Sequence, residues 1–157
     1  MNKEHENLIR HLKGIRKVVI NNCHGGFGLS PEAVLKYCEK AGIQVWLEYD
    51  EQFKSMDMAT YFTVPLEQRI EASPVNWHSM TLAERQAHNA AYSKTVINDR
   101  EIARDDPYLV QVVEEMGSDA NGKFAELKVV EIPADVDWII DEYDGAEWVA
   151  EKHRRWS

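Results

Sequence analysis

The chain has 157 residues, of which 44% are hydrophobic and 29% charged, a composition typical of one soluble globular domain over residues 1–157. The net charge of −9 argues against non-specific binding of nucleic acid, because phosphate contacts require a basic surface. The sequence has two cysteines, no signal-peptide pattern at its polar start and no run of about 18 apolar residues, so we expect a cytoplasmic protein without a membrane partner.

The first third of the chain predicts two helices and two strands in alternation. Apolar residues at helical spacing indicate a helix over 3–15, and a β-branched run at 17–21 indicates a buried strand. Pro31 begins a helix that runs to about residue 40, and apolar residues alternate over 43–49 as in a strand. Because a strand–helix–strand order favours a right-handed crossover, we expect the two strands to pair in parallel.

A glycine-rich loop at 22–30 joins the first strand to its helix. Gly25, Gly26 and Gly28 permit close approach of the backbone to a neighbour or ligand, and Ser30 is a favourable helix N-cap. A strand, a glycine loop and a helix N-terminus together often receive anions. The spacing matches neither dinucleotide nor P-loop motifs and the loop has no lysine, so a turn with glycines for tight packing is an equal alternative.

The middle of the chain is less regular. Residues 50–80 show no clear periodicity beyond a candidate strand at 59–64, and we expect a covered irregular segment rather than a mobile lid. A capping box predicts a helix over 81–95, and an Asp-Pro pair begins another over 106–116. A strand is predicted at 124–132.

The last segment carries the strongest hairpin signal in the chain. Asp144 and Gly145 lie between two aromatic and β-branched runs, and a two-residue turn there makes Glu142 face Glu147. Two opposed carboxylates are unfavourable unless a cation lies between them, and we expect solvation at an exposed edge instead. The predicted fold is therefore α/β (or α+β), with a mixed sheet, helices on its faces and a C-terminal β-hairpin.

Several blocks of the sequence resemble a family of small, largely uncharacterised proteins from phages, large viruses and bacteria. The first block is the run at 19–30, which contains His-Gly-Gly-Phe-Gly-Leu-Ser. Further blocks are Arg-Asp-Asp-Pro at 104–107, Leu-Lys-Val-Val-Glu-Ile-Pro at 127–133, and the ending from Glu-Tyr-Asp-Gly at 142–145 to Glu-Lys-His-Arg at 151–154. The resemblance implies a phage or accessory origin, hence the host cytoplasm, and brings no activity.

Two kinds of side chain are candidates for chemistry. His24 follows a strand and could act as a general acid–base in an exposed loop. Its neighbour Cys23 is disfavoured as a catalytic partner, because adjacent residues of an extended chain point to opposite faces. Arg104 precedes a capped helix and is a candidate for gripping a carboxylate or phosphate, with a surface ion pair as the alternative.

The leading functional hypothesis is the binding of a nucleotide-like or other anionic small molecule, which in a phage setting would sequester a host signalling nucleotide in an anti-defence role. The predicted ligand-binding residues are Asn22, Gly25, Gly26, Phe27, Gly28, Ser30, Arg100, Arg104 and Arg154. One alternative is an enzyme that uses His24 as acid–base on a phosphorylated or nucleotide substrate. The other is a module that inhibits a host protein through the acidic, aromatic hairpin. No cofactor or metal site is predicted, and an edge hairpin rich in Trp and Tyr is compatible with a homo-oligomer.

Overall fold

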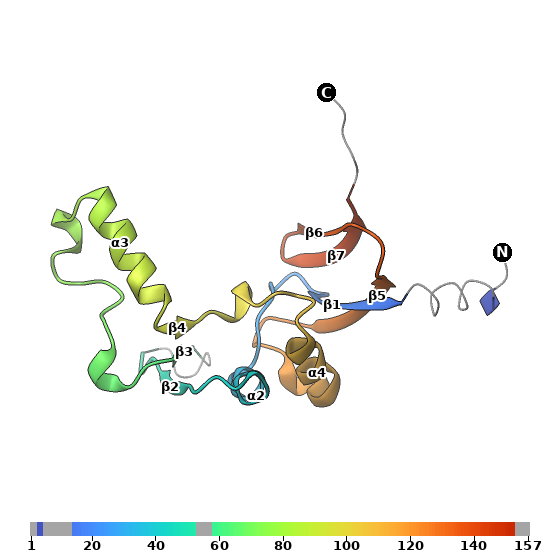
Figure 1. Cartoon of the computed structure of the whole chain (residues 1–157), viewed down its shortest axis with the longest axis horizontal. Helices are drawn as coiled ribbons and strands as arrows, with labels where there is room; N and C mark the ends of the chain where they lie inside the picture. The colour runs from blue at the N-terminus through green and yellow to red at the C-terminus, as the bar shows by residue number, and fades with distance from the viewer. Residues whose placement is uncertain (1–2, 5–13, 53–57, 153–157) are drawn as a thin grey trace, which may run out of the picture. The chain divides into compact units, whose positions relative to one another are not determined.

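The computed structural model describes residues 3–4, 14–52 and 58–152 (Figure 1). Its helices and strands, the latter in several small sheets with a C-terminal hairpin, confirm the predicted α/β class. The chain divides into two compact units, which we describe separately: unit 1 holds residues 1–37 and 100–157, and unit 2 holds residues 38–99. The single domain over 1–157 stays a prediction, and the predicted helix over 3–15 lies mostly outside the described residues.

The core of unit 1 is an antiparallel strand pair covered by a helix. Strand β1 (Ile15–Asn21) pairs along its full length with β5 (Leu127–Pro133). Helix α4 (Pro107–Met116) packs on both strands, as Figure 1 shows. Val18 of β1 and Leu109 of α4 are fully buried, so apolar burial holds these elements together.

The predicted parallel pairing of 17–21 with 43–49 is wrong. Strand β2 (Trp46–Tyr49) pairs instead with β3 (Ala59–Phe62), which pairs with β4 (Val96–Ile97), and every one of these pairings is antiparallel. The reason lies in length and burial: β2 has four residues, none of them buried, whereas β5 matches all seven residues of β1 in register.

The helices begin and end where their capping residues predict. Helix α2 (Pro31–Ala41) is followed by Gly42 at φ 71°, which an L-residue with a side chain rarely adopts. Helix α3 (Leu82–Ser93) starts from the capping box of Thr81, and the Asp106 carboxylate caps α4. No helix within the described residues is long and apolar enough to cross a membrane.

Unit 2 exposes much of the apolar surface that its sequence carries. Residues 50–80 were expected to form a covered segment, but the side chains of Leu66 and Val75 are 72% and 99% exposed. Helix α3 likewise has no buried residue. The guanidinium of Arg69 lies 4.1 Å from the ring centroid of Phe62, a cation–π contact. Short 3-10 turns complete the two units: η2 (Leu66–Gln68), η3 (Trp77–Ser79), η4 (Asp99–Glu101) and η5 (Gly117–Ala120).

The C-terminal hairpin of unit 1 has the predicted register. Strands β6 (Trp138–Tyr143) and β7 (Ala146–Glu151) are joined by Asp144 and Gly145, both at positive φ, and Glu142 faces Glu147. The hairpin contacts β1 through β7. It therefore stands beside the end of β1, where the glycine loop begins.

Candidate functional site

Asn21, at the end of β1, joins four segments of unit 1. It is fully buried, and its Nδ2 donates to the carbonyl oxygens of Cys23 at 2.7 Å and Gly145 at 2.8 Å. Its Oδ1 accepts from the main-chain N–H of Glu126 at 2.8 Å, and its own N–H donates to Glu147 Oε1 at 2.7 Å. Through these bonds Asn21 links β1 to the glycine loop, to the segment before β5 and to the hairpin. We call Asn21 and its partners Cys23, Glu126, Gly145 and Glu147 the Asn21 junction.

A bidentate ion pair between Arg104 and Glu147 completes the Asn21 junction. Arg104 donates from Nη1 to Glu147 Oε1 at 2.7 Å and from Nη2 to Oε2 at 3.0 Å, with the two side chains 16% and 11% exposed. The guanidinium lies 3.5 Å from the ring centroid of buried Phe27, and Nη1 also reaches the carbonyl oxygen of Val19. Arg104 therefore binds a carboxylate of the same chain, that of Glu147.

Gly25 of the loop, and two glycines from other segments that lie against the loop, make close backbone contacts. A Cβ on Gly25 would overlap the carbonyl oxygen of Phe124, and one on Gly145 would lie 2.6 Å from the carbonyl oxygen of His24. Gly122 is likewise too close to Gly28 for a side chain, and its N–H donates to the Gly28 carbonyl at 2.8 Å. Gly25 thus has the tight-packing role that the sequence left as the alternative to a ligand loop, whereas a Cβ on Gly26 would meet no atom within 4 Å.

The start of α2 is engaged with the turn η5. Ser30 Oγ accepts from the N–H of Ala33 at 3.2 Å and donates to the Asp119 carbonyl at 2.6 Å, and the Ser30 N–H donates to Ala120. Pro31 has no N–H to offer. The donors that an anion would meet at this helix terminus are thus partly absent and partly used.

The other predicted site residues lie at several places. Asn22 and His24 are exposed in the loop, and Arg100 is exposed in η4. Cys23 Sγ lies 3.2 Å from the Phe124 carbonyl oxygen and 3.4 Å from Asn21 Oδ1, neither of which is a base. Arg154 lies outside the described residues. The binding and catalytic roles assigned to the predicted residues stay predictions.

Asn21 and Glu147 are the residues of the junction that sequence reasoning missed. The expected solvation of the opposed Glu142 and Glu147 is wrong for Glu147, because Arg104 neutralises it in a largely buried place. Glu142 accepts from the N–H of Gly145 at 3.1 Å. The opposed carboxylates were themselves the signal, since they required a cation and Arg104 had no other evident role.

Two surface grooves lie among the described residues of unit 1. One, of about 420 Å³, is lined by residues 15–17 of β1, by Asp105 and by α4 residues between Pro107 and Glu114, and we call it the edge groove. The other, of about 240 Å³, is lined by the end of β5 and by the hairpin, including Trp138 and Val149. Within the described residues, no group of three or more His, Cys, Asp or Glu side chains gathers to hold a metal ion.

Comparisons with family models, with curated proteins and with solved structures found no match to this chain. The family suggested by the sequence blocks stays a prediction.

The ion pair of the junction gives a first testable prediction. Glu147→Gln leaves the Arg104 guanidinium largely buried without its counter-charge, so we expect the free energy of unfolding to fall by about 3 kcal/mol in urea titrations. Glu142→Gln, on the opposite strand, is the matched control and should change it by less than about 0.5 kcal/mol. Equal effects of the two variants would contradict the buried role of Glu147.

The glycine loop gives a second. Gly25→Ala places a methyl group against the Phe124 carbonyl oxygen. Gly26→Ala places its methyl group in open space, so its cost in stability is only that of an alanine at positive φ, about 1–2 kcal/mol. We expect Gly25→Ala to lower the melting temperature clearly more than Gly26→Ala. A Gly25→Ala variant with the melting temperature of the wild type would show that this backbone contact does not form.

The two thiols should differ in reactivity. Cys38 is fully buried, and burial raises the pKa of its thiol, so at pH 8 it holds less of the reactive thiolate than a solvated cysteine. Cys23 is half-buried. With a thiol-specific disulfide reagent we expect Cys23 to be modified in the folded protein and Cys38 only in denaturant, with the sites identified by peptide mass spectrometry. Prompt labelling of Cys38 in the folded state would contradict its burial.

Proposed function

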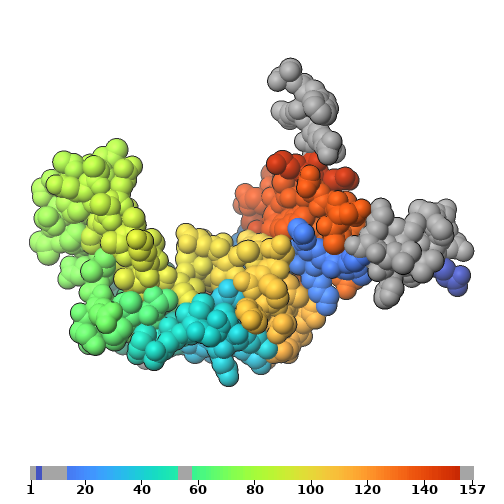
Figure 2. All heavy atoms as spheres, viewed as in Figure 1, coloured from blue at the N-terminus to red at the C-terminus, as the bar shows by residue number. Residues whose placement is uncertain are grey.

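We propose that this protein is an interaction module that presents one face of its C-terminal hairpin to a basic protein surface. Side chains alternate across a strand, and Glu147 points inward to Arg104. The opposite face, here called the outer hairpin face, carries Ile139, Asp141 and Tyr143 of β6 and Ala146, Trp148 and Ala150 of β7. In Figure 2 the hairpin forms the red and orange part of the surface.

Exposed apolar area on the outer hairpin face is the observation that carries the proposal. Tyr143 is 73% exposed, Trp148 47% and Ile139 38%, and all three share this face. A cluster of large apolar side chains on one face is typical of a contact surface, and Trp and Tyr are the residues that most often dominate binding energy.

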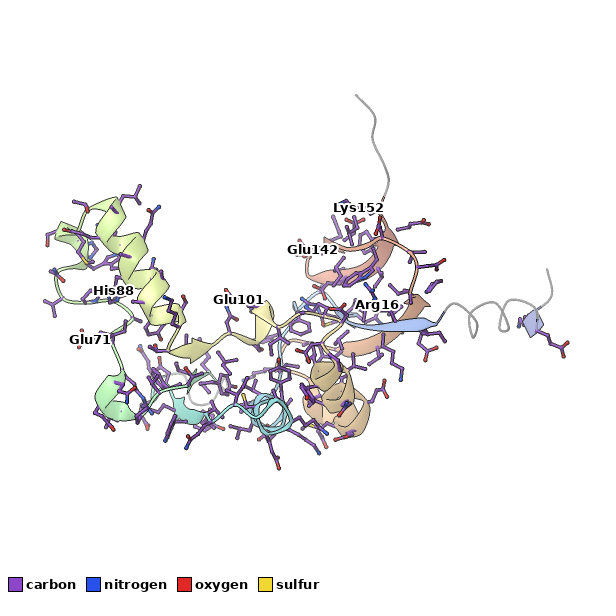
Figure 3. All side chains as sticks on the ribbon, viewed as in Figure 1. Arg16, Glu71, His88, Glu101, Glu142 and Lys152 are labelled. Atoms are coloured by element: carbon purple, nitrogen blue, oxygen red, sulfur yellow. The ribbon has the colours of Figure 1, made fainter. Side chains whose placement is uncertain are left out.

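The charge around this face favours a basic partner. Residues 134–151 contain seven Asp or Glu and no Lys, Arg or His. Asp144 is exposed at the hairpin turn, and Figure 3 shows Glu142 on the strand leading to it. Exposed aromatic rings among carboxylates suit arginine and lysine side chains, which gain both cation–π and ionic contacts.

The anchoring of the hairpin supports the same function. Asn21 holds the Gly145 carbonyl, and Arg104 holds the Glu147 carboxylate, so the turn and the second strand are attached to the core of unit 1. A surface that is already ordered loses less conformational entropy on binding. In the phage or accessory setting that the resemblance implies, the partner is a host protein whose activity the contact blocks.

The two other hypotheses have less support from these contacts. Of the three arginines predicted to bind an anionic ligand beside the glycine loop, Arg104 has its charge already balanced by Glu147. Catalysis by His24 has no supporting partner among the contacts described above. Both stay hypotheses.

The test uses a fluorescent nonamer of arginine as a probe of basic surfaces. We expect saturable binding that weakens with added salt, and Trp148→Ala to weaken it about tenfold through loss of a central aromatic contact. Tyr108→Ala, which removes a 43%-exposed ring on α4, is the matched control and should leave the affinity unchanged.

Two outcomes would count against the proposal. If Trp148→Ala and Tyr108→Ala bind the probe alike, the attraction is general acidity rather than the outer hairpin face. If native mass spectrometry of the purified protein instead releases a nucleotide-like compound, the anionic-ligand hypothesis takes precedence.

A further inference from the structure

Strand β1 has one edge that β5 does not use. In an antiparallel pair, alternate residues exchange hydrogen bonds with the partner, and the residues between them point their main-chain groups away. The N–H of Ala134 donates to Gly14, and the N–H of Asn22 donates to Glu126, which places the even-numbered residues of β1 in bonded pairs. The odd-numbered residues therefore direct their N–H and C=O groups to the opposite edge.

That edge is closed at one end. The N–H of Val19 donates to the Arg104 carbonyl at 2.8 Å, the Val19 carbonyl accepts from the Arg104 guanidinium, and the Asn21 N–H donates to Glu147. Within the described residues, the outward groups of Ile15 and Lys17 make no such hydrogen bonds. The open stretch of the edge is thus short and has a defined end at Val19.

The edge groove lies beside this open stretch. Its apolar lining comes from Ile15 of β1 and from Pro107 and Val110 of α4. It also contains two ion pairs, Lys17 Nζ with Glu114 at 2.7 Å and Arg16 Nη1 with Asp105 at 4.0 Å. Figure 3 marks Arg16 on β1.

The charges of the groove select against a charged occupant. The hydrogen bond from Lys17 to Glu114 raises the pKa of Lys17 above its ordinary value. Each cation in the groove already has a carboxylate, and the four charges sum to zero. A charged side chain entering the groove would meet no unpaired opposite charge among these four groups, whereas an uncharged apolar side chain would cover the apolar lining.

We infer that β1 accepts an extended peptide segment of a partner protein, which adds as a strand at Ile15–Lys17 and directs an uncharged apolar side chain into the edge groove. The main-chain groups of Ile15 and Lys17 supply the hydrogen bonds, and the groove supplies side-chain selectivity. An extended polypeptide is the occupant whose donors and acceptors alternate with the spacing of those on β1. This inference is independent of the outer hairpin face.

The test uses capped, uncharged pentapeptides that alternate threonine and valine, with the central residue varied among Val, Ile, Leu and Phe. Titrated to millimolar concentration against the isotope-labelled full chain, at least one should give saturable shifts of the Ile15 and Lys17 amide resonances. The same peptide methylated on every backbone nitrogen should give none, because it can no longer donate hydrogen bonds to the edge.

Variants at one position separate main chain from side chain. Lys17→Pro removes an N–H that β5 does not use, which an edge strand tolerates, and should weaken binding about tenfold. Lys17→Ala loses the same ion pair with Glu114 but keeps the N–H, so it should bind like the wild type. Glu131→Pro removes an outward N–H at the far edge of β5 and should also leave binding unchanged.

Three results would overturn the inference. The first is the absence of saturable shifts with every peptide of the set. The second is equal binding by the methylated peptide, a result that does not depend on any variant folding. The third is self-association of the free protein that Lys17→Pro abolishes in sedimentation velocity, because the edge would then take a second copy of the chain.

Discussion

The largely buried ion pair between Arg104 and Glu147 is the interaction on which the arrangement of unit 1 depends. Each side chain is more than four-fifths covered, so each charge requires the other as compensation for the water that it has lost. Because Arg104 precedes α4 and Glu147 lies on β7, the pair joins the helical cover of the core to the hairpin. Asn21 shares the Glu147 carboxylate and extends the same network into β1.

The glycine loop follows from that network rather than organising it. Once the hairpin turn is held against the end of β1, the backbone at His24 lies so close to Gly145 that no side chain fits between them. A glycine signals close approach, and it does so equally for a ligand and for another part of the same chain. In this loop the neighbours are residues 122–124 and the hairpin turn.

The same anchoring leaves two surfaces of different chemistry. The hairpin directs Glu147 inward to Arg104 and directs Tyr143 and Trp148 outward, which concentrates exposed apolar area within an acidic segment. Arg104 meanwhile closes the edge of β1 at Val19 and leaves the stretch beside the edge groove open. One surface offers side chains and negative charge, and the other offers main-chain hydrogen bonds in a neutral groove.

The sequence by itself determined the local features: the caps of α3 and α4, the glycine that ends α2, and the register of the hairpin. These depend on residues within a few positions of each other, whose geometry the backbone dictates. Tertiary structure alone decided that β1 pairs with β5, and that Arg104 neutralises a carboxylate 43 residues away. Which strands pair depends on every apolar run of the chain, and which charges pair in the interior depends on all of its carboxylates and cations. The spacing of neighbouring residues carries no information about these distant alternatives.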